Sequence, residues 1–144
     1  MKTTATRAML LLGVFYCVVG LVSGSLAGRA ASHQALVAWR WAAWVISAIA
    51  FGAHIVYEQV RLHTSPRITA LHVSCAAGLG AFGLAVAANI HGLTVSPGRP
   101  SLLMVLSLVI WPVMTAVAGF VVALVAATLF ARVGGSSRLR HRRT

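Results

Sequence analysis

The chain has 144 residues, of which 59% are hydrophobic and 9% are charged, and its mean hydropathy is +0.88. A soluble domain carries about 25% charged residues, so this composition excludes a globular protein surrounded by water. Twelve Lys and Arg residues stand against one acidic residue, Glu58, and a single carboxylate excludes the paired-acid glycoside hydrolases and the carboxylate-rich di-iron sites.

Four apolar stretches are long enough, or nearly so, to cross the ~30 Å hydrocarbon core of a bilayer, which takes about 20 helical residues. Each is predicted to be helical because backbone amides in lipid need hydrogen-bond partners within their own segment. The connections are short, which favours antiparallel neighbours. The sequence therefore predicts an all-α, up-down four-helix transmembrane bundle in residues 1–133, with helices at about 8–28, 39–60, 68–90 and 101–131.

The first stretch also has features of a signal peptide, because basic residues precede it. A signal core has about 7–15 apolar residues, whereas this stretch is longer and carries glycines at helical spacing. We therefore expect it to remain as the first helix of the bundle.

The basic residues predict the orientation of this bundle. Nine of the twelve fall at the two ends of the chain and in the connection between the second and third helices. The other side has three: Arg29, Arg40 and Arg99. The positive-inside rule then places both termini in the cytoplasm, as expected for a bacterial-type inner (plasma) membrane. Trp39, Trp41 and Trp44 agree, because indole rings favour the headgroup layer and these three lie at the predicted outer end of the second helix.

Residues 134–144 consist of Gly-Gly-Ser-Ser followed by a run rich in arginine. This pattern predicts a flexible basic tail in the cytoplasm. Each arginine near an anionic leaflet contributes about 1 kcal/mol of binding, so anionic lipids are the expected partner of the tail. A nucleic-acid partner is not expected, because the basic residues do not form a patch interleaved with aromatic residues on a folded surface.

Glycines at steps of three and four residues predict close helix packing. In the first helix they share one face with Cys17, because residues three or four apart return to the same side of a helix. Such faces let a second backbone approach closely. We favour a partner helix in the same chain, and a second protomer is the alternative. The predicted packing glycines are Gly13, Gly20, Gly24, Gly28, Gly80 and Gly83.

The fourth helix contains Trp111-Pro112. Proline lacks the N–H of an intrahelical hydrogen bond and clashes with the preceding turn, so a kink is predicted at Pro112. We interpret it as a bend that fits a long helix to the bilayer, and a hinge or a cavity at mid-depth is the alternative.

The polar residues within the spans are the main candidate site, because ionisable groups at membrane depth are costly and face the interior. His54 and Glu58 lie four residues apart on one helix face, with Arg61 three further on. His72 enters the third helix at a similar depth. The sequence therefore predicts a cluster of His54, Glu58 and His72 that faces the interior of the bundle.

Four interpretations of this cluster are open. We favour a structural role in which Glu58 pairs with Arg61 while His54 and His72 bond to the backbone or to each other. The second is a divalent metal site made by His54, Glu58 and His72. The third is bis-histidine haem ligation by His54 and His72. The fourth is a proton relay.

No Ser/His/Asp arrangement, phosphate-binding loop or Cys-x-x-Cys motif is present. We therefore expect a small structural or accessory subunit of a membrane complex, without a cofactor, rather than an enzyme. A membrane redox protein that binds metal or haem through His54 and His72 is one alternative. A small transporter is another, and it requires a homo-oligomer, because the first helix and most of the fourth offer no polar path.

Overall fold

A computed structural model of the chain describes the backbone of residues 2–95 and 102–141, and the side chains of residues 4–95 and 102–132. Within these ranges the chain forms four α-helices and no strands. They are α1 (Lys2–Gly28), α2 (His33–Arg61), α3 (Pro66–Val95) and α4 (Leu102–His141). All four are long and apolar enough to cross a membrane, which confirms the prediction of an all-α chain with four long apolar helices.

Every helix is longer than the apolar stretch that predicts it. The second begins at His33 rather than near residue 39, because Ser32 caps it: the Ser32 hydroxyl accepts a hydrogen bond from the Ala35 N–H at 3.2 Å. The fourth continues to His141, so the segment predicted as a flexible tail is helical as far as this residue. Adding residues to an existing helix needs no new nucleus, which explains why α4 passes the end of its apolar stretch.

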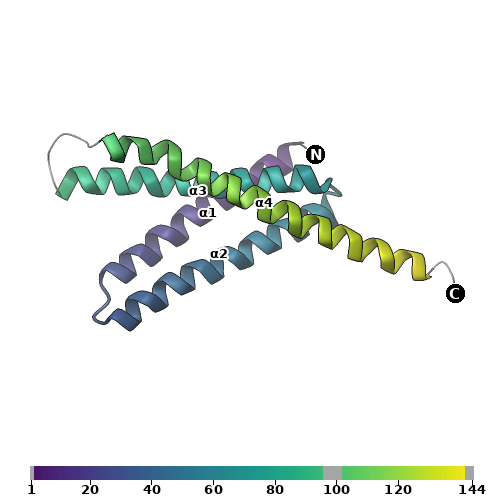
Figure 1. Cartoon of the computed structure of the whole chain (residues 1–144), viewed down its shortest axis with the longest axis horizontal. Coiled ribbons are helices and arrows are strands. Elements are labelled where there is room, and N and C mark those ends of the chain that lie inside the picture. The colour runs from purple at the N-terminus through teal and green to yellow at the C-terminus, as the bar shows by residue number, and fades with distance from the viewer. Residues whose placement is uncertain (1, 96–101, 142–144) are drawn as a thin grey trace.

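The four helices form two hairpins, α1–α2 and α3–α4, that converge at one end and diverge at the other (Figure 1). The third helix is central and packs along both α1 and α4, whereas α2 packs along α1 and meets α3 and α4 only over a short stretch. In the described part of the chain, α1 and α4 do not contact each other. The arrangement is consistent with a four-helix bundle, but it is more open than the predicted bundle of evenly packed neighbours.

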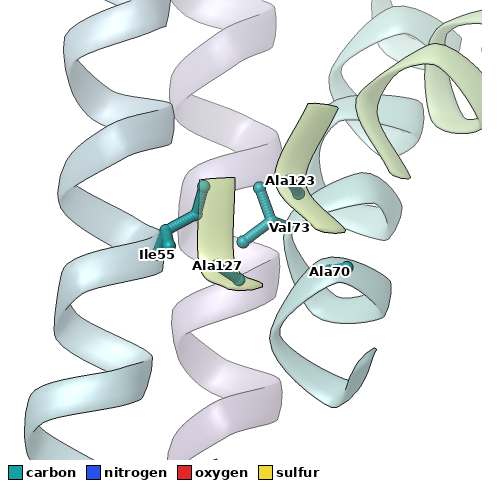
Figure 2. Close-up of a cluster of buried hydrophobic side chains, with 5 residues drawn as sticks. All are labelled: Ile55, Ala70, Val73, Ala123 and Ala127. Carbon is teal, nitrogen blue, oxygen red and sulfur yellow. The ribbon is translucent and has the colours of Figure 1, made fainter. Parts of the chain in front are cut away.

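A small apolar core holds the hairpins together where they converge. Ile55 of α2 and Val73 of α3 lie on either side of the segment of α4 that carries Ala127, and Ala123 lies beside Val73 (Figure 2). Lipid is as apolar as a leucine side chain, so helices associate in it mainly through small residues and polar contacts. The alanines of this core allow such close contact. The core residues are Ile55, Ala70, Val73, Ala123 and Ala127.

Glycines make the contact between α1 and α3. A Cβ atom added to Gly80 would lie 2.6 Å from the Tyr16 Cβ, and one added to Gly13 would lie 2.9 Å from the Leu79 Cβ. Gly83 likewise packs against Cys17 and Gly20 against Leu84. The structure thus brings four of the six predicted packing glycines to one interface within the chain.

Gly24 and Gly28 lie differently. A Cβ atom added to either would meet nothing within 4 Å, and α1 diverges from α3 toward the α1–α2 turn (Figure 1). The predicted packing surface therefore extends further along α1 than the contact that the structure shows within one chain.

The fourth helix continues unbroken through Pro112. At this position it lies against α3: a Cβ atom added to Gly78 would lie 3.5 Å from the Pro112 carbonyl oxygen and 3.2 Å from the Ala116 Cβ. The Thr115 hydroxyl donates to the Trp111 carbonyl at 2.8 Å. The packing around Pro112 is thus formed by small residues, and the kink remains a prediction.

Candidate functional site

The predicted residues His54, Glu58 and His72 come together where the two hairpins converge. His54 and Glu58 lie on the last turns of α2, and His72 lies near the beginning of α3. The Glu58 Oε1 lies 2.8 Å from the His72 Nδ1 and 3.4 Å from the His54 Nε2. Two imidazoles from two helices therefore approach the same carboxylate oxygen.

Glu58 is completely buried, with 0% of its surface exposed. A buried carboxylate is tolerated only when it is paired and hydrogen-bonded, and His72 supplies the shortest contact. His72 is the more accessible member, since 27% of its side chain is exposed. Any exchange of protons or water with this carboxylate would therefore pass by His72 rather than by His54, whose side chain is 1% exposed.

The α2–α3 turn and the beginning of α3 each add a hydroxyl that the sequence did not single out. The Thr64 hydroxyl donates to Glu58, whose carbonyl oxygen lies at 3.1 Å and whose Oε2 lies at 3.3 Å. It also shares a 2.7 Å hydrogen bond with the hydroxyl of Thr69, which is fully buried. We call His54, Glu58, Thr64, Thr69 and His72 the polar cluster. Thr64 was recognisable only as the sixth residue after the single acid, too weak a signal to find it.

The backbone of the turn is also tied to Glu58. The Glu58 carbonyl accepts hydrogen bonds from the Leu62 N–H at 3.2 Å and from the Thr64 N–H at 3.3 Å. Between them His63 has a φ of 51°, a left-handed conformation that non-glycine residues adopt at a cost of roughly 1–2 kcal/mol. This turn brings Thr64 back over the end of α2. Glu58 therefore contacts the turn through its carbonyl oxygen and the other residues of the polar cluster through its side chain.

His54 lacks the hydrogen bonds that its neighbours have. Its contact with Glu58 falls within ion-pair distance, yet neither ring nitrogen has a hydrogen-bond partner of acceptable geometry. The contact between the two side chains is therefore weak, because a hydrogen bond weakens steeply with distance and misalignment. His54 is thus a buried imidazole that lies beside the carboxylate without being fixed by it.

The predicted pairing of Glu58 with Arg61 is wrong. Among the described side chains, those within ion-pair distance of the Glu58 carboxylate are His54 and His72, whereas Arg61 is exposed. Arg61 is the last residue of α2, so it lies beyond the turn that carries Glu58, and its long side chain can extend past the end of the helix. The neighbouring Gln59 instead links α2 to α4, because its Nε2 donates to the Ala127 carbonyl at 2.9 Å.

The geometry gives a metal ion little support. Zinc ligands lie about 2.0–2.2 Å from the ion, so the ligand atoms of a tetrahedral site are separated by roughly 3.3 Å. The 2.8 Å between Glu58 and His72 is the distance of a direct hydrogen bond. Within the part of the chain that the structure describes, no group of three His, Cys, Asp or Glu side chains is arranged to hold a metal.

Haem ligation meets a similar obstacle. Two axial histidines must approach the iron from opposite faces of the porphyrin. Here the ring nitrogens of His54 and His72 approach one oxygen of Glu58, so a carboxylate occupies the position that an iron would need. This arrangement favours a hydrogen-bonded cluster over an axial ligand pair.

Comparisons of the chain with protein-family models, with curated proteins and with solved structures find no match.

Proposed function

We propose that the chain is an integral protein of the inner (plasma) membrane with both termini in the cytoplasm. Four helices long and apolar enough to span a bilayer support this proposal, as do large apolar side chains on the outside, such as Leu11 at 70% and Leu103 at 78% exposure. The unequal distribution of the basic residues supports the orientation. Anionic lipids are the proposed partners of the basic C-terminal segment.

We further propose that the chain is a structural or accessory subunit of a membrane complex. One observation carries this proposal: the only acidic side chain is fully buried and joins α2, α3 and the turn between them. Its hydrogen bonds go to His72 and Thr64 of the same chain, so the group best suited to chemistry stabilises the fold instead. A role in assembly fits a chain whose apolar surface lies mostly on its outside.

Both proposals are testable in native membranes. A reporter fused after residue 144 should be active in the cytoplasm, and one inserted in the 29–32 turn should be active on the far side. The 15.1 kDa chain, expressed at its native level and solubilised gently, should migrate in a larger assembly that overproduced chain alone does not form. Equal migration in both samples would contradict the accessory role, and a reversed reporter pattern would contradict the orientation.

A second candidate is a ligand-binding or redox role for the polar cluster. The unpaired ring nitrogens of His54 favour it, because buried polar atoms in native proteins are normally hydrogen-bonded. Haem or a divalent metal is the ligand class that these residue types suggest, and its binding would require the Glu58 carboxylate to move away from the two imidazoles that approach it. An absorption spectrum and elemental analysis of the purified chain test this role. A Soret band or a stoichiometric metal that His54→Leu removes would support it, and a blank would favour the accessory subunit.

A further inference from the structure

The N-terminal half of α2 carries an arginine beside two tryptophans on one side of the helix. Val37, Arg40, Trp41 and Trp44 line a shallow pocket of about 320 Å³. These residues are spaced by three or four positions, so they share one face. We call these four residues the Arg40 face. Trp41 and Trp44 are 66% and 74% exposed, which leaves the face open over most of its area.

The Arg40 face lies on the same side of α2 that packs against α3 and α4 further along the helix. Val37 and Ile55 are 18 residues apart, which is five turns at 3.6 residues per turn, so both point to the same side of the helix. Ile55 is only 4% exposed and belongs to the core with α3 and α4. Between them, the Phe51 ring lies 3.8 Å from the position of a Cβ atom on Gly119 of α4.

The same side of α2 is therefore covered near the polar cluster and uncovered near its beginning. Figure 1 shows the cause: α2 runs away from α3 and α4 toward the α1–α2 turn. The exposure along this side falls from 74% at Trp44 to 4% at Ile55. The open half needs an occupant that is apolar along the helix and that carries a negative charge beside Arg40.

Charge decides what that occupant is. Glu58 is the only acidic side chain in the chain, and it is buried at the opposite end of α2. A second copy of the chain therefore offers no acidic side chain to Arg40. A phospholipid offers both requirements, a phosphate for the guanidinium and acyl chains for the apolar surface.

The depth of Arg40 suits a headgroup. It directly precedes the charge-free run 41–57, so in a bilayer its guanidinium reaches the headgroup layer, where the indoles of Trp41 and Trp44 are also favoured. An indole N–H is a hydrogen-bond donor only, so it adds to the preference for an anion. Position, charge and donor chemistry agree on one ligand class.

We propose that the Arg40 face is a binding site for an anionic phospholipid, with Arg40 on the phosphate, Trp41 and Trp44 beside the headgroup, and an acyl chain along the open side of α2. The site rests on the proposed membrane insertion but not on the proposed accessory role. The site binds this lipid in preference to other lipids of the bilayer because a cation and two indoles converge on one headgroup.

Native mass spectrometry of the full chain in detergent tests the site. Phosphatidylglycerol should bind at least about fivefold more tightly than zwitterionic phosphatidylcholine, and Arg40→Gln should weaken phosphatidylglycerol binding about tenfold. Arg40→Lys should keep part of the preference, because lysine keeps the charge and loses the bidentate geometry. The matched control is Arg29→Gln, which removes an arginine of the adjoining turn and should leave binding unchanged.

Several results would overturn the site. They are equal binding of the two lipids, equal loss in Arg29→Gln and Arg40→Gln, and displacement of the lipid by millimolar inorganic phosphate, which would indicate a site for free anions. Trp44→Leu, which keeps an apolar side chain, should weaken binding even if Arg40→Gln does not fold. A photoreactive residue at position 41 in native membranes should label lipid, and labelling of a protein instead would contradict the proposal. The lipid titration uses the purified chain, so it can fail while the larger assembly is still found.

Discussion

The Glu58 Oε1 and the His72 Nδ1 lie 2.8 Å apart and join the end of α2 to the beginning of α3. This hydrogen bond is the shorter of the two contacts that the Glu58 Oε1 makes with the histidines of the polar cluster. It lies beside the apolar core of Ile55 and Val73, so the polar and apolar contacts between the hairpins are concentrated at one end. At the other end α2 diverges from α3 and α4 (Figure 1).

Removing one partner of this pair should cost more than removing both. His72→Leu leaves the buried Glu58 without its closest partner, and we expect a loss of about 2–3 kcal/mol, below the roughly 3–5 kcal/mol of fully buried pairs because His72 is partly exposed. Glu58→Leu combined with His72→Leu should recover most of this loss, since an apolar pair can replace a buried ion pair. Thermal unfolding in detergent, followed by circular dichroism, measures both. His91→Leu is the control, because His91 is exposed. A double variant that is less stable than His72→Leu would contradict the pairing.

The Thr64 hydroxyl should contribute to stability although the residue lies in a turn. It bonds to Glu58 and to the buried Thr69, so Thr64→Val leaves the Thr69 hydroxyl without this partner and should destabilise the fold by about 1–3 kcal/mol. Thr94→Val is the matched control, because the Thr94 hydroxyl is exposed and bonds only to the nearby His91 carbonyl, so its effect should stay within about 0.5 kcal/mol. The same unfolding assay compares the two variants, and equal effects would show that the hydroxyl network is unimportant.

The glycines of α1 and α3 should divide into two classes. Gly80→Ala would place a Cβ atom 2.6 Å from the Tyr16 Cβ and 3.2 Å from the Gly13 carbonyl oxygen, so the helices must separate at a cost of about 1–3 kcal/mol. Gly24→Ala meets nothing within 4 Å and should stabilise α1 by up to about 1 kcal/mol. Unfolding temperatures and the oligomeric state in detergent decide the outcome. A loss of self-association in Gly24→Ala would instead show that this part of α1 contacts a second protomer.

The sequence predicts those features that depend on composition and helical periodicity. Four apolar stretches suffice for four helices, and a step of four residues places His54 and Glu58 on one face. The partner of Glu58 could not be predicted from α2 alone, because the local spacing favours Arg61 whereas the interhelical contact selects His72. The contribution of Thr64 depends on the left-handed conformation of His63, for which the sequence carries no glycine signal.

The open arrangement of the hairpins was also beyond the sequence. Short connections predict which helices are neighbours but not the angle between them. Asn89 illustrates the limit: it reads as a residue at the end of the third helix, yet α3 continues to Val95. The Asn89 Nδ2 donates to the Ser107 Oγ of α4 at 3.1 Å, so a polar pair joins α3 to α4. Neither residue by itself indicates this contact in the sequence.

His54 should behave differently from His72, although both contact the same carboxylate. Neither ring nitrogen of His54 has a hydrogen-bond partner, so His54→Leu removes an unsatisfied buried polar group and should change the unfolding free energy by less than about 1 kcal/mol, in contrast to His72→Leu. Comparing the unfolding free energies of the two variants distinguishes an imidazole that stabilises the fold from one that has no hydrogen-bond partner. A loss from His54→Leu as large as that from His72→Leu would show that the 3.4 Å contact with Glu58 acts as a full ion pair. That result would also remove the observation that favours a ligand at the polar cluster, because His54 would then have its partner within the chain.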